Sequence, residues 1–452
     1  MNYHPLVAAI LFLLLGWFPI AQADDGQQTT RGFDPLRGSL ARSEPQSIYA
    51  PDPEDAWNQV FFLLFTRTIA SRVMADGAPA FASGDDRLAL SNRRVTRIES
   101  GDRAIDPLYP SWLWMGSSFF DFEPDSAWLV LREPRYSRLV VALAGVRRTA
   151  ASRPPLARAL MQSDLWSAYD MLHAMTRLRR GPSAGDSAER ERAQALLPLV
   201  ATTMRTLALS GEEIARLPDT YSAAAMALGL PDVLGDRTAW MEIRWFPLRS
   251  HEQAAGHRRA ARVFFRPSEW PNDEGAFLNR FRERQGDNSA ALSSVALLIQ
   301  LLLVASDGTV VPSPITYEVQ FRGTAARAGG AEIPQYELSR RQMLSSPATG
   351  GLVAFDATAP AYLPMAGNDL AFATPPQLDG EPVVAPLGTR CSLCHGPGPG
   401  VGHLMTFSRS APPGQPLPPV DRLVSAQNVH AGDVARRKME LEEFRALRQH
   451  WQ

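Results

Sequence analysis

Five consecutive residues, Cys391-Ser392-Leu393-Cys394-His395, contain both cysteines of the 452-residue chain. Two thiols three positions apart can reach the two vinyl groups of one porphyrin, and the adjoining imidazole can then bind the iron from one side of the ring. In an exported chain, this C-x-x-C-H spacing is typical of covalent haem attachment. For two cysteines and eight histidines placed at random, such a pentapeptide is expected on the order of once in ten thousand chains. The sequence therefore predicts a covalent haem site.

These residues, with the glycines that follow from Gly396 on, resemble the haem-attachment site of c-type cytochromes. The resemblance implies one covalently bound haem c, with thioether links to Cys391 and Cys394 and a proximal iron bond to His395. It is confined to this motif. Small cytochromes place the motif at the end of a helix, whereas residues 375–390 contain several prolines and glycines and predict none. This departure implies either an abbreviated cytochrome fold or a haem pocket completed by the earlier part of the chain.

The distal iron ligand has several candidates. His403 and Met405 lie eight and ten residues after His395. At about 3.3 Å per extended residue, such a loop spans up to roughly 25 to 35 Å, which is enough to pass round the edge of a porphyrin. His430 precedes the last predicted helix, and Met439 lies within it. A methionine ligand favours a higher-potential electron carrier, whereas an open position favours binding of a gas or peroxide.

Three other interpretations of the cysteine pair need no haem. In an oxidising compartment, a lone C-x-x-C pair can form a disulfide beside an incidental histidine. A zinc site built from Cys391, Cys394, His395 and His403 is the second, but neighbouring ligands at 394 and 395 fit tetrahedral geometry poorly. A thioredoxin-like redox pair requires a strand before and a helix after the motif, which the proline- and glycine-rich surroundings do not predict.

The N-terminus has the pattern of an export signal. Leu6 to Ile20 is a mostly apolar run of fifteen residues, followed by the small-x-small sequence Ala21-Gln22-Ala23. The run is shorter than the roughly 20 residues that a membrane span requires. We therefore expect a signal peptide at residues 1–23 and a periplasmic location in a bacterium. The segment before Leu6 contains no lysine or arginine, so an uncleaved membrane anchor is the alternative.

The net charge and the basic residues limit the classes of partner that we expect. The formal net charge is −1, whereas a general nucleic-acid-binding protein usually has a basic excess. Lys438 is the only lysine in the chain, and we interpret this as a compositional bias rather than a functional signal. The expected partners are the haem-attachment machinery and redox donor and acceptor proteins, with a membrane added only if the signal segment is uncleaved.

The remaining chain predicts an α+β fold. The expected regions are a disordered lead-in (24–53), a mainly helical region (54–235), an antiparallel β-rich region (236–356) and a loop-rich haem-binding segment closed by a terminal helix (357–452). Within them we expect an apolar helix from Pro53 to Met74, an irregular segment over 76–125, and a terminal helix over 431–449.

Two local patterns are sharper. Asp307-Gly308 separates two apolar, β-prone runs and predicts a hairpin. Ser210 and Glu213 form a capping-box pattern that predicts a helix start.

The function that these observations predict is one-electron transfer by an exported mono-haem protein. A haem-dependent oxidoreductase or sensor with an open sixth position is one alternative. An exported interaction protein without haem, whose C-x-x-C pair is a disulfide, is the other.

Overall fold

The computed structural model describes most of the chain between residues 48 and 451. The described ranges are 48–73, 79–81, 89–90, 98–100, 103–105, 111–115, 128–177, 186–244, 258–273, 275–277, 292–323, 334–354, 360–363, 383–386, 421–422 and 429–451. All of them belong to one compact unit, Leu36–Gln452.

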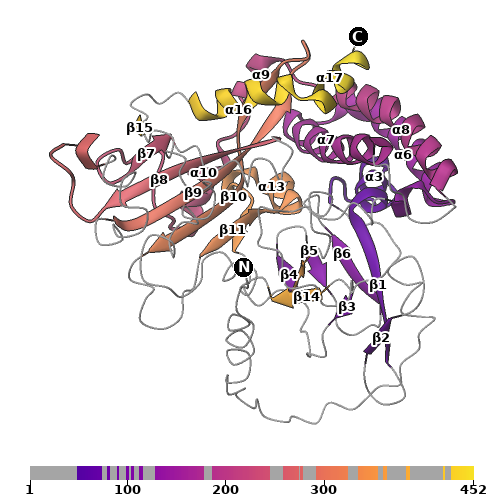
Figure 1. The fold of residues 1–452 in the computed structure, drawn as a ribbon, viewed down its shortest axis with the longest axis horizontal. Helices are drawn as coiled ribbons and strands as arrows, with labels where there is room; N and C mark the ends of the chain where they lie inside the picture. The colour runs from indigo at the N-terminus through magenta and orange to yellow at the C-terminus, as the bar shows by residue number, and fades with distance from the viewer. Residues whose placement is uncertain are drawn as a thin grey trace, which may run out of the picture. The chain divides into compact units, whose positions relative to one another are not determined.

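A seven-stranded antiparallel sheet occupies the middle of the chain (Figure 1), with the strand order β12-β11-β10-β9-β8-β7-β15. Its strands are β7 (Met241–Arg244), β8 (Arg259–Pro267), β9 (Leu292–Val304), β10 (Val310–Gly323), β11 (Gln335–Leu338), β12 (Leu352–Ala354) and β15 (Asp421–Arg422). Six of them follow one another as a meander, and β15 is added from the C-terminal region beside β7. Helices precede and follow these strands in the sequence. The prediction of an α+β fold is therefore confirmed.

The longest hairpin of the sheet is the one that the sequence predicts. Gly308 has φ 79°, a conformation that residues with a Cβ atom adopt rarely. The Asp307 carboxylate accepts hydrogen bonds from the backbone N–H of Thr309 at 2.9 Å and from its hydroxyl at 2.7 Å. The turn therefore closes through bonds among neighbouring residues, which is why it can be predicted locally.

Helices form a second layer around a shared hydrophobic core. They are α3 (Ala56–Phe65), α6 (Arg135–Thr149), α7 (Pro155–Arg177), α8 (Asp186–Leu207), α9 (Gly211–Ala215), α10 (Thr220–Leu228), α13 (Arg340–Ser345), α16 (Val429–Glu440) and α17 (Glu442–Gln449). The predicted capping box opens α9: the Ser210 hydroxyl accepts from the Glu213 N–H at 3.1 Å, and the Glu213 carboxylate accepts from the Ser210 N–H at 2.7 Å.

Two helix predictions need correction. The helix expected to reach Met74 ends at Phe65, and the chain continues as β1 (Thr66–Val73). Thr66, Thr68 and Ile69 are β-branched residues, which have a lower helix propensity because their χ1 angle is restricted in a helix. The segment instead pairs with two other strands as β1.

The expected terminal helix is two helices, α16 and α17, because Leu441 between them has an extended backbone with ψ 149°.

The segment expected to be irregular also contains short strands. They are β2 (Pro79–Phe81), β3 (Ala89–Leu90), β4 (Ile98–Ser100), β5 (Arg103–Ile105) and β6 (Ser111–Met115). In the C-terminal region, β13 (Pro360–Leu363) and β14 (Val383–Pro386) pair with each other, and β14 also pairs with β3 in parallel. Pairing between segments distant in sequence forms these strands, so local patterns do not reveal them.

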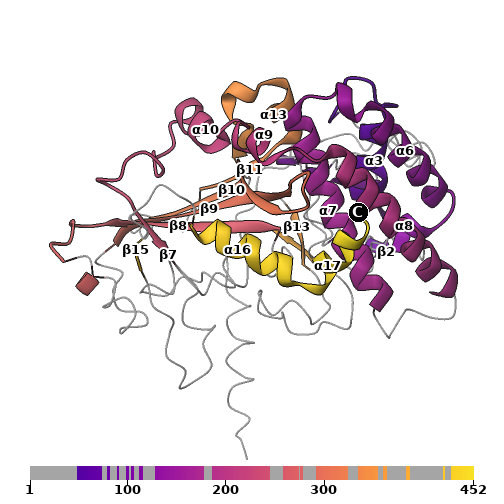
Figure 2. The same ribbon diagram turned by 90° about the horizontal axis from the view of Figure 1, so that it is seen from above.

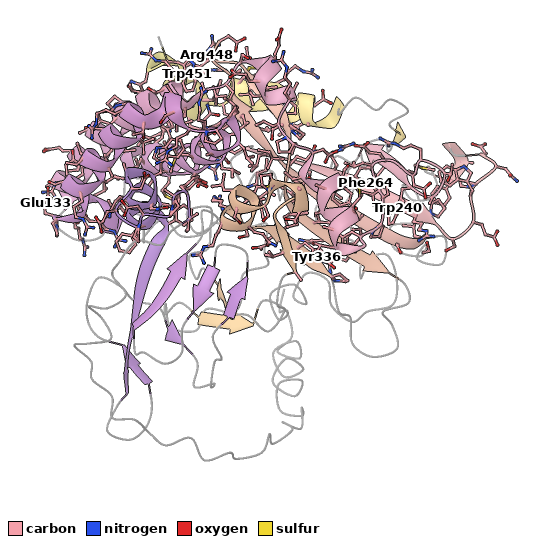
Figure 3. All side chains as sticks on the ribbon, turned by 180° about the vertical axis from the view of Figure 1, so that it is seen from behind. Glu133, Trp240, Phe264, Tyr336, Arg448 and Trp451 are labelled. Atoms are coloured by element: carbon pink, nitrogen blue, oxygen red, sulfur yellow. The ribbon has the colours of Figure 1, made fainter. Side chains whose placement is uncertain are left out.

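The seven-stranded sheet has helices on both of its sides (Figure 2). α10 and α13 lie on one side and α16 lies on the other. The side that faces α10 is called the core face here. Its residues belong to the main hydrophobic core and include Ala260, Phe264, Ala296, Leu298 and Val319. Phe264 is labelled together with Trp240, another core residue, in Figure 3.

Candidate functional site

The predicted haem-attachment residues lie outside the part of the chain that the structure describes. These residues are Cys391, Cys394 and His395, together with the distal candidates His403 and Met405. Their roles therefore stay predictions. The structure instead defines the elements that flank this segment in the chain.

The other two distal candidates lie on α16. His430 is the second residue of this helix. Met439 lies near its end, and its side chain is half-buried against the main hydrophobic core. Packing thus gives Met439 a structural role that needs no iron.

The segment that carries the predicted haem-attachment motif, residues 387–420, has a strand at each end. β14 ends at Pro386, five residues before Cys391, and β15 begins at Asp421, 26 residues after His395. β15 pairs with β7 through Asp421 opposite Arg244 and Arg422 opposite Ile243. The segment therefore returns to the main sheet at its β7 edge.

The sheet surface next to this edge is apolar. Side chains alternate between the two faces of a strand, so the face opposite the core face can be read from the strand register. Its residues on the three strands beside β15, called the β7–β9 wall here, are Met241, Ile243, Ala261, Val263, Phe265, Val295, Leu297 and Ile299. All except the half-buried Leu297 are at most 7% exposed, yet none belongs to the main hydrophobic core.

The same face becomes polar beyond β9. Glu318, Gln320 and Arg322 on β10 stand opposite Ile299, Leu297 and Val295 of the wall.

Hydrogen bonds join these polar groups into a ladder. The Glu318 carboxylate accepts from Gln320 at 2.5 Å and from Gln335 of β11 at 2.9 Å, and Arg322 donates to the Gln320 amide oxygen at 2.9 Å. On this face, the apolar surface is thus limited to the strands between β9 and the β15 edge of the sheet.

Lys438 on α16 is the centre of a buried charge cluster. Its ammonium group is completely buried and lies 2.8 Å from the Asp170 carboxylate on α7 and 3.2 Å from that of Glu443 on α17. Arg258, just before β8, donates to the same Asp170 oxygen at 3.0 Å. The ammonium also lies 5.5 Å from the centre of the Trp166 ring. The cluster joins both C-terminal helices to α7 and to the start of β8.

The same face of α7 carries ionisable rings. Tyr169 stacks on His173 with 6.3 Å between the ring centroids, and the His450 ring meets Tyr169 edge-on at 6.5 Å. Burial is the main cause that raises the pKa of the Tyr169 hydroxyl, and the neighbouring Asp170 charge adds to it. Burial is also the main cause that lowers the pKa of His173, and the Arg177 charge adds to that shift. Both groups are therefore held in their neutral forms, which suits packing better than proton transfer near neutral pH.

The sequence analysis did not identify the buried charge cluster around Lys438 or the β7–β9 wall, although the sequence contains an indication of each. Lys438 was assigned to composition, but a single lysine in a chain with 46 lysine and arginine residues occupies a completely buried site. The run Val263-Phe264-Phe265 indicates the wall, because an unbroken apolar run in a strand indicates burial on both faces of the sheet. Phe264 and Phe265 are indeed both completely buried.

Within the described ranges, no three or more histidine, cysteine, aspartate or glutamate side chains gather where they could hold a metal ion. Among the helices in the same ranges, none combines the length and apolarity that crossing a bilayer requires. No family model matches the chain, and comparisons with curated proteins and with solved structures find no match.

Proposed function

We propose that this chain is an exported protein with one covalently attached haem c, and that it transfers single electrons in the periplasm. The observation that carries the proposal is the C-x-x-C-H motif formed by the two cysteines of the chain. Two thiols and an adjacent imidazole are the donor set that covalent haem needs. Cys391 and Cys394 would form the thioether links, and His395 would bind the iron.

The bound iron supplies the redox chemistry by changing its charge by one, and the protein controls its potential and its access to partners. His395 would fix the iron on the proximal side of the ring. The strands β14 and β15 precede and follow residues 387–420 in the chain, and both pair with other strands, so the two ends of this segment are joined to the described fold. Those partners would be redox donor and acceptor proteins.

Covalent attachment can be tested with one spectrum. The full chain is produced in a host with haem-attachment machinery, purified and denatured, and its Soret absorption is measured. We expect the band to stay with the denatured polypeptide. The double variant Cys391→Ala, Cys394→Ala should lose it, whereas Ser392→Ala, which changes a residue between the cysteines, should keep it. A wild-type protein that contains no covalent haem would refute the proposal.

The distal ligand can be identified in the same protein. Reduced spectra with and without carbon monoxide separate a six-coordinate carrier, which resists the gas, from an open site, which binds it at once. If the iron is six-coordinate, Met405→Ala and His403→Ala are compared, and the variant that gains carbon monoxide binding identifies the ligand. Rapid gas binding by the wild type would favour the alternative of a haem enzyme or sensor.

Export has its own measurement. N-terminal sequencing of the mature protein is expected to begin at Asp24, after Ala21-Gln22-Ala23. A protein that retains Met1 and sediments with membranes would show an uncleaved anchor instead.

A further inference from the structure

We propose that Met226 on α10 is a site of reversible oxidation, at which a hydroperoxide converts the thioether to a sulfoxide and a thiol-dependent methionine sulfoxide reductase restores it. The Met226 sulfur attacks one peroxide oxygen, the O–O bond breaks, and water or an alcohol leaves. The sulfur is oxidised by two electrons and the peroxide is reduced by two. In the repair step, two thiols are oxidised to a disulfide and the oxygen leaves as water. The inference goes beyond the proposed function and does not depend on haem.

The first argument is the exposure of Met226. Its side chain is 83% exposed. The other methionines whose side chains the structure describes are covered: Met161, Met171, Met204, Met241 and Met343 are at most 8% exposed, and Met439 is half-buried. An oxidant must reach a thioether before it can react with it. Of these methionines, Met226 is therefore the one that meets a dissolved peroxide directly.

The second argument is the small size of the neighbours of Met226. Residues three and four positions apart share one face of a helix, and a methionine side chain leans over the turn before its own Cα atom. The residues at these positions before Met226 are Ser222 and Ala223, and Gly229 follows three positions later. None of the three has a side chain large enough to cover the sulfur. A peroxide and the active site of a reductase can therefore both approach it.

The third argument is that a sulfoxide at this position leaves the fold intact. α10 packs through another face, on which Thr220, Tyr221, Ala224 and Ala225 are buried. A sulfoxide is polar, and a polar group that is buried without a partner destabilises a core. At Met226 the added oxygen stays in water. The side chain can thus be oxidised and reduced in turn while the protein remains folded.

The rate of oxidation can be measured with hydrogen peroxide and the full folded chain. Samples are taken over time and digested, and mass spectrometry follows the oxygen added to each methionine. Met226 should react at least about tenfold faster than Met161 and Met204, because a completely buried sulfur reacts only in molecules that have opened. Similar rates at the three positions would overturn the inference.

The tolerance of the fold has a matched pair of variants. Glutamine is a polar side chain of similar length to methionine sulfoxide, so Met226→Gln imitates the oxidised site. It should keep the melting temperature of the wild type. Met204→Gln places the same side chain at a completely buried position of the main core and should lower the melting temperature. An equal fall in the two variants would overturn the inference.

Repair is tested on the oxidised, folded protein. It is incubated with the two methionine sulfoxide reductases, one for each sulfoxide epimer, and with dithiothreitol. The oxygen at Met226 should be removed without denaturation. A sulfoxide that the enzymes reduce only after the protein has been unfolded would overturn the inference.

The failures of the two proposals are distinguishable. The double variant Cys391→Ala, Cys394→Ala should oxidise at Met226 as fast as the wild type, because the peroxide reacts directly with the thioether. A slower reaction in this variant would overturn the direct reaction. Absence of covalent haem in the wild type would refute the proposed function and leave this inference standing.

Discussion

Asp164 on α7 is a buried carboxylate that the Tyr49 hydroxyl and the Arg340 guanidinium hold in place. It accepts from the Tyr49 hydroxyl at 2.5 Å and from the Arg340 guanidinium at 2.9 Å and 2.5 Å. Arg340 comes from α13 and also lies over the Phe61 ring, 5.6 Å from its centre. Two-point contact with a carboxylate needs the planar guanidinium fork. The pair thus ties α13 to α7 and to the segment before α3.

Replacing Arg340 tests this buried pair. Arg340→Met leaves the Asp164 carboxylate buried without its cation, which should lower the free energy of unfolding by about 3–5 kcal/mol. The double variant Asp164→Leu, Arg340→Met should recover part of this loss, because no uncompensated charge stays inside. Urea unfolding of the wild type, both single variants and the double variant measures the coupling. Additive losses would show that the two residues do not act as a pair.

His173 gives the fold a dependence on pH. Its pKa lies below the ordinary value of 6.5 because it is partly buried and next to Arg177, while Glu443, Asp170 and Glu442 oppose the shift. The unfolded chain therefore binds a proton at a higher pH than the folded chain does. Stability from this group is present above about pH 6.5 and is lost as the pH falls from there through the folded pKa.

The measurement is the melting temperature between about pH 7.5 and about pH 5.5. His173→Gln, which cannot titrate, should show a smaller fall over this range than the wild type. Identical falls in the two proteins would contradict the assignment to His173. The wild type and the variant share all other histidines, so the difference between their curves isolates this residue.

At the scale of elements, α16 is held through a site shaped for an ammonium group. Lys438 is completely buried between Asp170 and Glu443. A guanidinium has the same charge but is larger and planar, so it overfills a close-packed site. This explains why a chain that otherwise uses arginine keeps lysine at this position.

Lys438→Arg should therefore destabilise the protein although it preserves the charge. We expect a loss of about 1–3 kcal/mol and faster amide hydrogen exchange in α16. Arg436→Lys on the same helix is the control: its side chain is 69% exposed, and its effect should be within about 0.5 kcal/mol. An arginine at position 438 that leaves exchange in α16 unchanged would show that the site does not discriminate by size.

At the scale of the whole molecule, the described part of the chain has one hydrophobic core, built from the helices and from the core face of the sheet. Because this core joins residues from α3 to α17, we expect it to fold without the haem. Haem contacts would add stability on top of it, since a group that binds only the folded state raises its stability.

The double variant Cys391→Ala, Cys394→Ala tests this independence. It should lose the Soret band, keep the far-ultraviolet circular dichroism of the wild type and unfold cooperatively at a lower temperature than the haem-loaded protein. If its circular dichroism were that of an unfolded chain, haem would be needed for the fold itself.

The features that the sequence alone determined are those closed by neighbouring residues. The Asp307-Gly308 turn and the Ser210–Glu213 capping box each depend on hydrogen bonds within three residues. The haem-attachment prediction is local in the same way, because two thiols and an imidazole must lie within one turn of chain. The α+β character also follows from short-range periodicity.

Tertiary structure decided the rest because burial and strand pairing join residues far apart in the chain. The switch from helix to strand after Phe65 depends on pairing with β6. Lys438 acquires its role from Asp170, 268 positions earlier. Phe264 and Phe265 are neighbours in β8, yet only Phe264 belongs to the main hydrophobic core. A haem-attachment motif can thus be predicted from five residues, whereas the two faces of the sheet are defined only once β7, β8 and β9 lie side by side.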